Sequence, residues 1–384
     1  MKNPTCPSTI FVEITNICNF DCTFCPNHLM TRKKGMMDFE LFKKIALDAR
    51  ACGIKRFLLW IMGEPFLHPR FFEFARFAKE HNLELSLITN GGLLKVDLIN
   101  RFLDLKLSDK DELLVSYLTP NPCAFGLRKA GALDFDTYKQ GIYKLIERKI
   151  ATRGKVKIIL IYMINIFGDV VSTPGVITNA DDALGHIREL SAFAEGIKRK
   201  EGVDFRVVIP SKKQIETNIK NCREIKREIL PGVFFQLKWL TNWGKVILPD
   251  GLRVVPSQRG YCAYPFETLG IFWDGQVTLC CDDYEGALVV GDTKEQSIGE
   301  IFNSEKARRI RSDMDEGRLT MPRCQICQGV VIDKEGKVLR NYYKKYYLGR
   351  VFRHLRVHGL KKTVSKILAE LKANPIHKNF MIEP

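Results

Sequence analysis

Short apolar stretches alternate with longer amphipathic stretches from residue 8 to residue 210. The apolar stretches predict strands over 9–16, 55–61, 84–89, 112–118, 156–164 and 204–209. The stretches between them have helical periodicity, which predicts helices over 38–51, 69–81, 93–104, 135–149 and 181–200. Such alternation is typical of repeated βα units around a parallel sheet. We therefore predict an α/β fold with a partial, open (β/α)6 TIM-like barrel, in which ligands bind at the carboxyl ends of the strands.

The pattern changes beyond the barrel. Residues 269–273 and 276–279 flank Asp274-Gly275, a strong hairpin signal, and a helix is expected over about 297–312. Two further amphipathic helices are indicated by apolar repeats at Tyr343, Tyr347, Val351 and Leu355 and at Leu360, Val364, Ile367, Leu368 and Leu371. We expect a barrel over 8–215, a connecting segment over 216–260, a small cysteine-rich domain over 261–330 and a basic helical tail over 331–384.

Composition limits the protein class. The chain of 384 residues has 60 basic and 44 acidic residues, a net charge of +16, and an ordinary hydrophobic content of 45%. No uncharged apolar run approaches the roughly 18 residues that cross a bilayer, and the start is too short and polar for a signal peptide. We therefore expect a cytoplasmic protein. In a reducing compartment the clustered cysteines favour metal ligation over disulfides, and Cys6, Cys52 and Cys222 have no partner at ligand spacing.

Three cysteines follow the first predicted strand at close spacing: Cys18, Cys22 and Cys25. A 4Fe–4S cluster normally takes four thiolates. A set of three therefore leaves one iron open to bind a small molecule. The alternative is a zinc site, in which His28 would be the fourth ligand.

The run Cys18-Asn19-Phe20-Asp21-Cys22-Thr23-Phe24-Cys25 resembles the signature of the radical S-adenosylmethionine (SAM) enzymes. In that family the open iron binds the methionine part of SAM. An electron then cleaves SAM, and the resulting 5'-deoxyadenosyl radical abstracts a hydrogen atom from the substrate. The resemblance thus implies a 4Fe–4S cluster and SAM as cofactors, which supply the difficult chemistry while the protein positions them.

Motifs after the next three predicted strands resemble the same family. Met62-Gly63-Glu64-Pro65 is similar to its Gly-Gly-Glu-Pro motif, which contacts the SAM amino group, although Met62 departs from it. Thr89-Asn90-Gly91-Gly92 is similar to its Thr-Asn-Gly turn. A Ser and an Arg of the family hold the SAM carboxylate, and Ser116 and Arg128 are the matching residues, although Tyr117 and Leu118 depart from the usual Ser-Leu-Asp. Taken singly, each motif also fits an ordinary turn or a surface arginine. The cofactor-binding residues that the resemblance implies are Phe24, Gly63, Glu64, Pro65, Thr89, Asn90, Gly91, Ser116 and Arg128.

A second cysteine cluster follows the predicted hairpin. Its order resembles the SPASM domain of many radical SAM enzymes, in the shortened "twitch" form that carries one auxiliary cluster. The resemblance implies an auxiliary 4Fe–4S cluster on Cys262, Cys280, Cys324 and Cys327, with Cys281 as a spare or alternative ligand. Four cysteines ending in Cys-x2-Cys also describe a structural zinc site, so spacing alone leaves the metal open.

Two residues are candidates for a catalytic role. Cys123 lies on the expected substrate face, where it would donate a hydrogen atom, although a lone cysteine is more often a packing residue. Asp282, beside the auxiliary ligands, would accept a proton, unless it is an exposed loop residue. Trp239, Trp243 and Tyr264 are candidate walls of the substrate site by position.

The leading hypothesis is a radical SAM oxidoreductase acting on a small polar or glycan-like substrate, with oxidation, such as alcohol to ketone, assisted by the auxiliary cluster. The alternative is a radical SAM enzyme that modifies a peptide or protein. We expect it less, because a triad beginning at Cys18 leaves no room for the N-terminal peptide-recognition domain of many such relatives. A hypothesis from another class, a zinc-stabilised nucleic-acid-binding protein, would use the net positive charge but leaves the triad unexplained.

The charge also suggests partners. The resemblance implies an acidic flavodoxin- or ferredoxin-type electron donor, which a basic surface attracts. Between Arg340 and Lys378 eleven Lys or Arg residues face one acid, Glu370. A basic amphipathic helix there would lie on an anionic membrane surface, giving peripheral contact with the inner membrane, or would pack on the barrel with its basic face in solvent.

Overall fold

The computed structural model describes residues 6–118, 120–164, 176–220, 224–239, 242–248, 250–339, 355, 359–365 and 367–368. Most of the predicted tail, including Tyr343, Tyr347, Val351 and Leu371, lies outside the described residues, as does Cys222. Among the described residues no helix is both long and apolar enough to cross a membrane.

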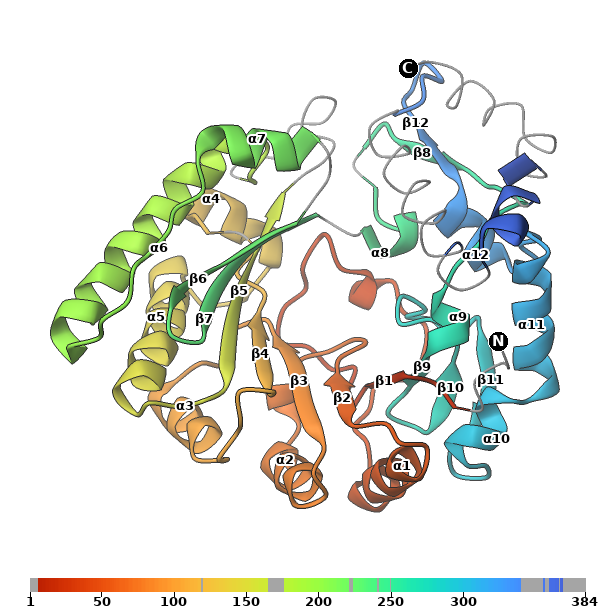
Figure 1. Ribbon diagram of the computed structural model, residues 1–384, viewed down its shortest axis with the longest axis horizontal. Coiled ribbons are helices and arrows are strands. Elements are labelled where there is room, and N and C mark those ends of the chain that lie inside the picture. Colours follow the sequence, from red (N-terminus) through yellow and green to blue (C-terminus); the bar gives the residue numbers. More distant parts are fainter. Residues whose placement is uncertain are drawn as a thin grey trace.

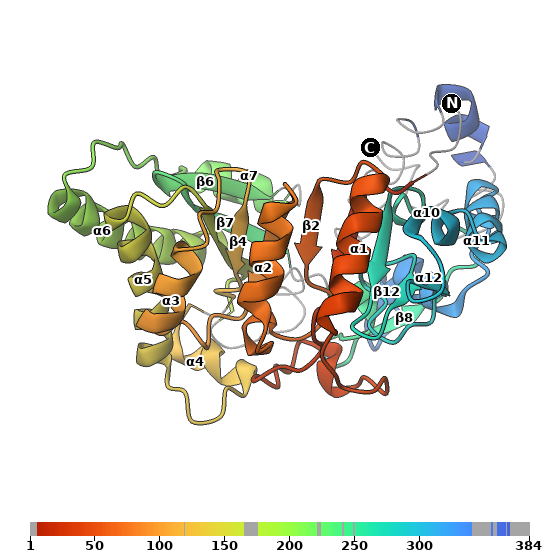
Figure 2. The same cartoon turned by 90° about the horizontal axis from the view of Figure 1, so that it is seen from below.

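One curved sheet of ten strands organises the chain, with strand order β11-β10-β9-β1-β2-β3-β4-β5-β7-β6. Six strands that run parallel to their neighbours form its centre, and helices cover its outer face (Figures 1 and 2). These strands are β1 (Thr9–Val12), β2 (Arg56–Leu59), β3 (Glu84–Thr89), β4 (Glu112–Val115), β5 (Lys157–Ile164) and β7 (Val233–Trp239). The predicted α/β fold with a TIM-like partial barrel is confirmed.

The barrel helices begin and end close to their predicted positions. They are α1 (Phe39–Ala51), α2 (Phe71–Glu80), α3 (Val96–Leu103), α5 (Phe135–Ala151) and α6 (Ala180–Glu201). Asp38 caps α1, and its carboxylate accepts hydrogen bonds from the N–H groups of Glu40 and Leu41. Asp181 and Asp182 lie in the first turn of α6, where the helix dipole favours negative charge.

The sixth barrel strand comes from a different segment than predicted. Residues 204–209 form no strand. After α7 (Lys212–Lys220), the antiparallel hairpin of β6 (Ile225–Leu230) and β7 completes the sheet, and β7 pairs with β5. Val233, Phe235 and Leu237 are buried on one face of β7. β7 pairs with β5 and buries these side chains, whereas the 204–209 segment is more exposed and pairs with no strand. The structure therefore has two sheet strands, β6 and β7, where we expected a connecting segment.

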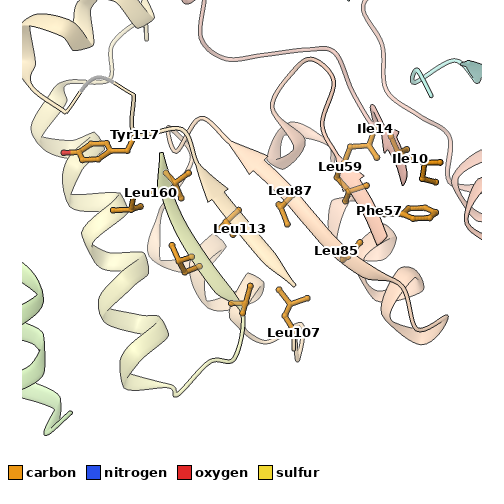
Figure 3. Packing of buried hydrophobic residues seen from close by; sticks show 14 of the residues in the cluster. Ile10, Ile14, Phe57, Leu59, Leu85, Leu87, Leu107, Leu113, Tyr117 and Leu160 are labelled. Atoms are coloured by element: carbon orange, nitrogen blue, oxygen red, sulfur yellow. The ribbon is translucent and has the colours of Figure 1, made fainter. Parts of the chain in front are cut away.

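The core lies between the sheet and its outer helices. Alternate strand residues point toward the helices and bury apolar side chains, because successive residues of a strand face opposite sides. Figure 3 shows this layer, which includes Ile10, Phe57, Leu59, Leu85, Leu87, Leu113 and Leu160.

The cysteine-rich region extends the same sheet. The predicted hairpin is present as β9 (Thr268–Ile271) and β10 (Gln276–Thr278), and its Gly275 has φ +94°. β9 pairs with β1 in parallel, and β11 (Val289–Asp292) lies at the edge (Figure 1). The helix α9 (Tyr264–Glu267) precedes β9, and the helices α10 (Ile298–Phe302), α11 (Glu305–Asp315) and α12 (Pro322–Gln328) follow β11. A small separate sheet consists of β8 (Arg253–Val255) and β12 (Val330–Ile332). The two cysteine-bearing regions thus share one sheet.

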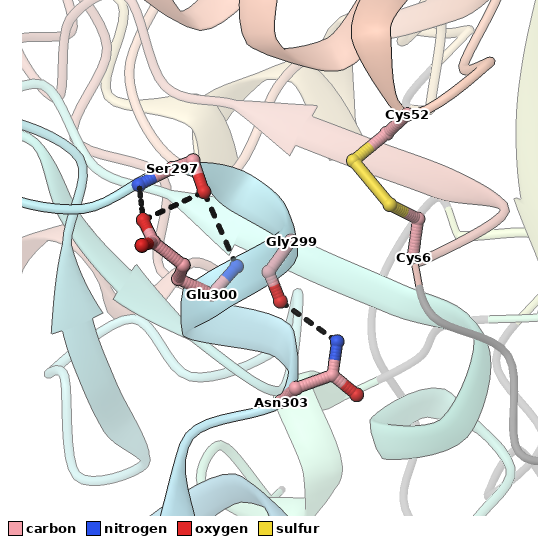
Figure 4. The surroundings of a disulfide bond; sticks show 6 residues. All are labelled: Cys6, Cys52, Ser297, Gly299, Glu300 and Asn303. Atoms are coloured by element: carbon pink, nitrogen blue, oxygen red, sulfur yellow. Dashed lines mark hydrogen bonds between the residues drawn. A yellow bond between two sulfur atoms is a disulfide. The ribbon is translucent and has the colours of Figure 1, made fainter.

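Cys6 and Cys52 have no partner at ligand spacing in the sequence, but the structure pairs them with each other. They form a disulfide that ties the segment before β1 to the end of α1, next to Gly299 of α10 (Figure 4). Their sequence separation of 46 residues gives no local signal.

Candidate functional site

The three cysteines of the triad lie in the loop that follows β1. The N–H of Cys25 donates to the carbonyl of Cys22 at 3.0 Å, and the N–H of Thr23 donates to the carbonyl of Leu127 at 2.9 Å. The loop is therefore held against the short helix η3 (Gly126–Arg128), which follows β4.

Burial raises the pKa of all three triad thiols, to about 11 for Cys22 and about 12 for Cys25. The charge of each neighbouring thiolate also raises the pKa of Cys22 and Cys25. A bound cationic metal group reverses this preference, because metal coordination favours the thiolate. The described residues include no group of three His, Cys, Asp or Glu placed to hold a single metal ion. Three thiols in one loop, with the polar side chain of Asn90 bonded to Cys18, fit an iron–sulfur cluster that keeps one iron open.

The Gly63-Glu64 turn after β2 packs directly on the start of the triad loop. Gly63 has φ +79°, and a Cβ there would lie 2.3 Å from the carbonyl oxygen of Thr15. Only glycine allows the backbone at position 63 to pack this closely on Thr15 with a positive φ. The N–H of Glu64 donates to the carbonyl of Ile17 at 2.8 Å, one residue before Cys18. The short helix η2 (Pro65–Leu67) begins at the next residue.

Glu64 is buried at the ends of β2 and β3. Its carboxylate accepts hydrogen bonds from Thr89 Oγ1 at 2.9 Å, from the N–H of Asn90 at 2.7 Å and from the N–H of Phe66 at 3.2 Å. Burial raises the pKa of Glu64 to about 7, against the opposing effect of these donors. A carboxylate of this kind is suited to a cationic ligand group, because the added charge favours the ionised form.

Asn90 connects this turn to the triad. Its Nδ2 donates to Cys18 Sγ at 3.5 Å and to Asn19 Oδ1 at 2.8 Å. Gly91 has φ +82°, and a Cβ on Gly92 would lie 2.5 Å from the ring of Phe20. The glycines therefore let the triad loop pack closely on the end of β3.

Arg128 completes the group. Its side chain is buried over the rings of Phe20 and Tyr138, and Nη2 donates to the carbonyl of Ser116. Nη1 lies 3.4 Å from the carbonyl oxygen of Asn90, and the guanidinium charge lowers the pKa of Cys18 and Cys22 against their burial. Arg128 is thus not a surface arginine. The structure gathers the predicted Glu64, Thr89, Asn90, Ser116 and Arg128 around the triad, and Phe24 lies within the triad loop, directly before Cys25.

The second cysteine cluster assembles from three elements. Cys262 precedes α9, Cys280 follows β10, and Cys324 and Cys327 lie on α12. Burial raises the pKa of Cys280 well above its usual range and that of Cys324 to about 12, and charges on neighbouring cysteines raise both further. The charges of Cys262 and Cys327 act on both thiols, so the four predicted ligands lie within electrostatic reach of one another, and Cys281 is also within reach of Cys262.

Cys281 faces a different environment. Cys262, Cys280 and Cys324 pack against the main core, whereas Cys281 packs with Cys25 in a second apolar group. We call this group the shared apolar cluster, because it contacts a cysteine of each region. Its members are Phe11, Ile61, Met62 and Phe272, with Cys25, Met30, Leu58, Trp60, Trp243, Cys281, Tyr284 and Val289 packed on them.

Two basic side chains bond to the backbone near the auxiliary cysteines. Nζ of Lys245, a buried residue of α8 (Asn242–Lys245), donates to the carbonyl groups of Cys327 and, at 2.8 Å, Gly329. Nη2 of Arg323 donates to the carbonyl of Asp282 at 3.2 Å. Sequence reasoning missed Lys245, because a single lysine outside any motif gives no signal of burial.

The remaining candidates occupy varied places. Asp282 is not the exposed loop residue that we considered, since burial raises the pKa of its carboxyl group despite the charge of Arg323. Cys123 is exposed on α4 (Pro122–Phe125). Trp243 belongs to the shared apolar cluster, and Tyr264 begins α9. The side chain of Trp239 lies outside the described residues.

Two family models match the chain. That of the radical SAM superfamily matches residues 12–169, and that of SPASM, an iron–sulfur cluster-binding domain, matches residues 262–328. The matches cover both cysteine-bearing regions, and they favour iron–sulfur clusters over the zinc sites that spacing alone left open.

Two curated proteins are similar to part of the chain. The tungsten-containing aldehyde ferredoxin oxidoreductase cofactor-modifying protein of Pyrococcus furiosus is 34% identical over 97 residues, which are 25% of this chain and 27% of that protein. The PqqA peptide cyclase of Gluconobacter oxydans is 30% identical over 95 residues, 24% of this chain and 26% of that protein. The matched segments thus span about a quarter of each relative.

Among solved structures, Streptococcus suis SuiB bound to S-adenosylmethionine has the same fold. Its TM-score is 0.51 and its identity 14%, over 84% of this chain and 72% of that chain. Together the two family models show that the chain belongs to the radical SAM superfamily and carries a C-terminal SPASM domain, so that its cofactors are SAM and 4Fe–4S clusters.

Proposed function

We propose that this radical SAM enzyme modifies a peptide or protein substrate. The observation that carries the radical chemistry is the gathering of Glu64, Asn90 and Arg128 around Cys18 at the strand ends. The name of the PqqA peptide cyclase supports a peptide as the substrate class. This substrate replaces the small polar or glycan-like molecule of the leading sequence hypothesis as our first choice.

The residues divide into two sites in this proposal. Cys18, Cys22 and Cys25 hold the SAM-binding cluster, and Cys262, Cys280, Cys324 and Cys327 hold the auxiliary cluster. When bound, the first cluster and SAM supply the 5'-deoxyadenosyl radical. Glu64 and the backbone at Gly63 bind the amino group of SAM, and Arg128 binds its carboxylate, because a guanidinium pairs bidentately with a carboxylate. Phe24, Pro65, Thr89, Gly91 and Ser116 complete the predicted SAM site.

The shared apolar cluster is the proposed substrate floor. Trp60, Trp243 and Tyr284 are only partly buried there, and Cys25 and Cys281 pack against the same group. Aromatic side chains bind a large apolar group with little loss of conformational entropy. A substrate side chain on this floor lies between the two proposed cluster sites, where hydrogen abstraction and electron transfer both reach it.

Oxidation of a small polar or glycan-like substrate is the second candidate. The place of Asp282 beside the auxiliary cysteines favours it, because a carboxylate there would accept the proton that an alcohol loses on oxidation. The name of the Pyrococcus furiosus relative, a cofactor-modifying protein, also fits a substrate that is not a peptide. Cys123, exposed on α4, keeps the role of a candidate hydrogen donor.

Peripheral membrane contact of a cytoplasmic enzyme is part of the proposal. In the described residues of the tail, 359–365 and 367–368 are helical, and Leu360, Val364 and Leu368 on one face are exposed. Lys361 and Lys362 flank this face. Exposed apolar residues bordered by lysines suit the surface of an anionic membrane. A flavodoxin or ferredoxin is the proposed electron donor, because its acidic surface complements the net charge of +16.

The substrate class is tested with reconstituted, reduced enzyme and SAM. A cell extract is separated by size, and each fraction is assayed for its stimulation of 5'-deoxyadenosine release. We expect the peptide fraction to stimulate release, and protease treatment of that fraction to abolish the effect. Stimulation that survives protease favours a small molecule and overturns the peptide proposal. The Cys18/Cys22/Cys25→Ala variant is the control, since it should release no 5'-deoxyadenosine.

A further inference from the structure

One side chain, Arg32, joins the loop that follows the triad to the loop that follows Cys280. Its Nη1 and Nη2 donate to the two carboxylate oxygens of Glu13, at 3.1 and 3.0 Å. Its Nε donates to the carbonyl of Tyr284 at 2.7 Å. Its guanidinium also lies over the ring of Phe272, 3.8 Å from the centroid. Arg32 therefore bonds at once to the barrel and to the cysteine-rich region.

Glu13 is the fixed end of this contact. It directly follows β1, its side chain is fully buried, and its N–H donates to the carbonyl of Ile271 at 2.8 Å. Because β1 pairs with both β2 and β9, Glu13 is held by the centre of the sheet. The triad loop leaves the sheet after this residue and returns to it through Arg32.

Residues next to Arg32 also bond to the cysteine-rich region. The N–H of Thr31 donates to both carboxylate oxygens of Glu285, at 2.9 and 3.0 Å. The indole N–H of Trp273 donates to the carbonyl of Lys33 at 3.1 Å. A Cβ on Gly35 would lie 2.5 Å from the Trp273 ring, so the loop backbone packs directly on the indole. Residues 31–35 are thus bound to 271–285 along their length.

The chemistry of the pair argues for a positioning role. A buried ion pair contributes little net stability, because the desolvation of both groups offsets their attraction. Its geometry is nevertheless specific, since the planar guanidinium donates in fixed directions that a lysine does not reproduce. An arginine is needed here to satisfy Glu13, Tyr284 and the Phe272 face together. No part of the proposed SAM site includes Arg32 or Glu13.

We propose that Arg32, clamped by Glu13, is a positioning residue that fixes the separation of the SAM-binding and auxiliary clusters. The clamp lies close to both sites along the chain, since Arg32 follows Cys25 by seven residues and Tyr284 follows Cys280 by four. Electron transfer between a substrate and the auxiliary cluster depends on that separation. The inference rests on the proposed cluster ligands but not on the identity of the substrate.

The test compares doubly reduced, iron-loaded enzymes by electron paramagnetic resonance, which detects the spin interaction between two reduced clusters. The main variant is Glu13→Gln with Arg32→Met, which removes both charges and leaves neither buried alone. The matched control is Lys79→Met with Asp111→Asn. That pair joins α2 to the segment before β4 at 2.7 Å, and both residues lie in segments that carry none of the proposed cluster ligands.

We expect the main variant to keep about eight irons per chain but to lose the wild-type spin interaction. The control should keep both. An unchanged interaction in an iron-replete main variant overturns the proposal, as does a wild-type enzyme with two reduced clusters and no interaction. If the main variant loses iron, Arg32→Lys is measured in its place, because it keeps the positive charge but lacks the planar guanidinium. The same two outcomes, loss or retention of the spin interaction, then support or overturn the proposal. A wrong assignment of the cluster ligands would be recognised separately, because the variants with the ligand cysteines replaced by Ala would then keep the iron content of the wild type.

Discussion

The carboxylate of Glu64 accepts a 2.7 Å hydrogen bond from the N–H of Asn90, joining the turn after β2 to the turn after β3. Asn90 in turn donates to Cys18 Sγ. A residue from each of three successive strand ends is thereby linked, so the proposed SAM site is organised before SAM binds. Preorganisation of this kind reduces the cost of ordering the site on binding.

Glu64 should make SAM binding depend on pH. Burial raises its pKa to about 7, so its ionised fraction grows between about pH 6 and pH 7.5. If the carboxylate binds the cationic amino group, SAM affinity rises over this window. Glu64→Gln should remove the dependence and weaken binding about tenfold. Equilibrium SAM binding to the oxidised, iron-loaded enzyme measures this, with Glu73→Gln, a half-buried residue of α2 that pairs with Arg70, as the control. A Glu64→Gln variant with the wild-type pH profile would contradict the role.

Cys280 and Cys281 should differ in iron binding. Only Cys280 packs with Cys262 and Cys324 against the main core. We expect Cys280→Ala to lower the iron content from about eight to about four per chain, and Cys281→Ala to leave it unchanged. Iron and acid-labile sulfide are measured after anaerobic reconstitution. Loss of iron in Cys281→Ala alone would make Cys281 the ligand.

The triad should account for the other half of the iron. Replacement of Cys18, Cys22 and Cys25 by Ala leaves no thiolates for the first cluster, so about four irons per chain should remain on the auxiliary site. Zinc is measured in the same samples. One or two zinc ions per chain in place of iron in the wild-type enzyme would falsify the proposed metal content of both sites.

Lys149 should give a pH-dependent contribution to stability. This buried amine on α5 donates to the carbonyl of Pro231, and burial lowers its pKa to about 8. Because the unfolded chain binds the proton up to about pH 10.5, deprotonation is favoured by folding. The free energy of unfolding relative to Lys149→Met should therefore rise from pH 8 to pH 10.5, by on the order of 1 kcal/mol after allowance for solvent screening. Denaturant unfolding across this range measures it.

The control for Lys149 lies on the same helix. Lys144 pairs with Glu147 at the surface of α5. Lys144→Met should show a nearly constant difference from the wild type over the same pH range. A parallel rise in both variants would mean that other groups titrate, and Lys149 would not be the cause.

The tail should bind anionic vesicles. Replacement of the exposed Leu360, Val364 and Leu368 by Gln removes the apolar face, and we expect most binding to vesicles containing phosphatidylglycerol to be lost. Added salt should weaken the binding of the wild type, because basic residues contribute about 1 kcal/mol each near such a surface. Flotation measures this, with Leu47→Gln, an exposed residue of α1, as the control. Equal binding to neutral phosphatidylcholine vesicles would contradict the electrostatic part.

Local patterns in the sequence predicted much of the barrel and the candidate site. Five of the six expected barrel strands are present. A strand that buries one side against helices has a run of apolar residues that can be recognised in the sequence. The hairpin at Asp274-Gly275 is encoded equally locally, since the turn needs a glycine with positive φ. The triad, Glu64, Asn90 and Arg128 were found through motifs of short length.

Only the tertiary structure decided which distant segments meet. The pairing of β9 with β1, the sixth strand at β7, the Cys6–Cys52 disulfide and the Arg32 contacts with Glu13 and Tyr284 join positions far apart in the chain. Burial of Lys245 against Cys327 and of Asp282 also depends on packing. Periodicity reports which side of an element is buried but not its partner, so contacts between elements emerge only when the whole chain is packed.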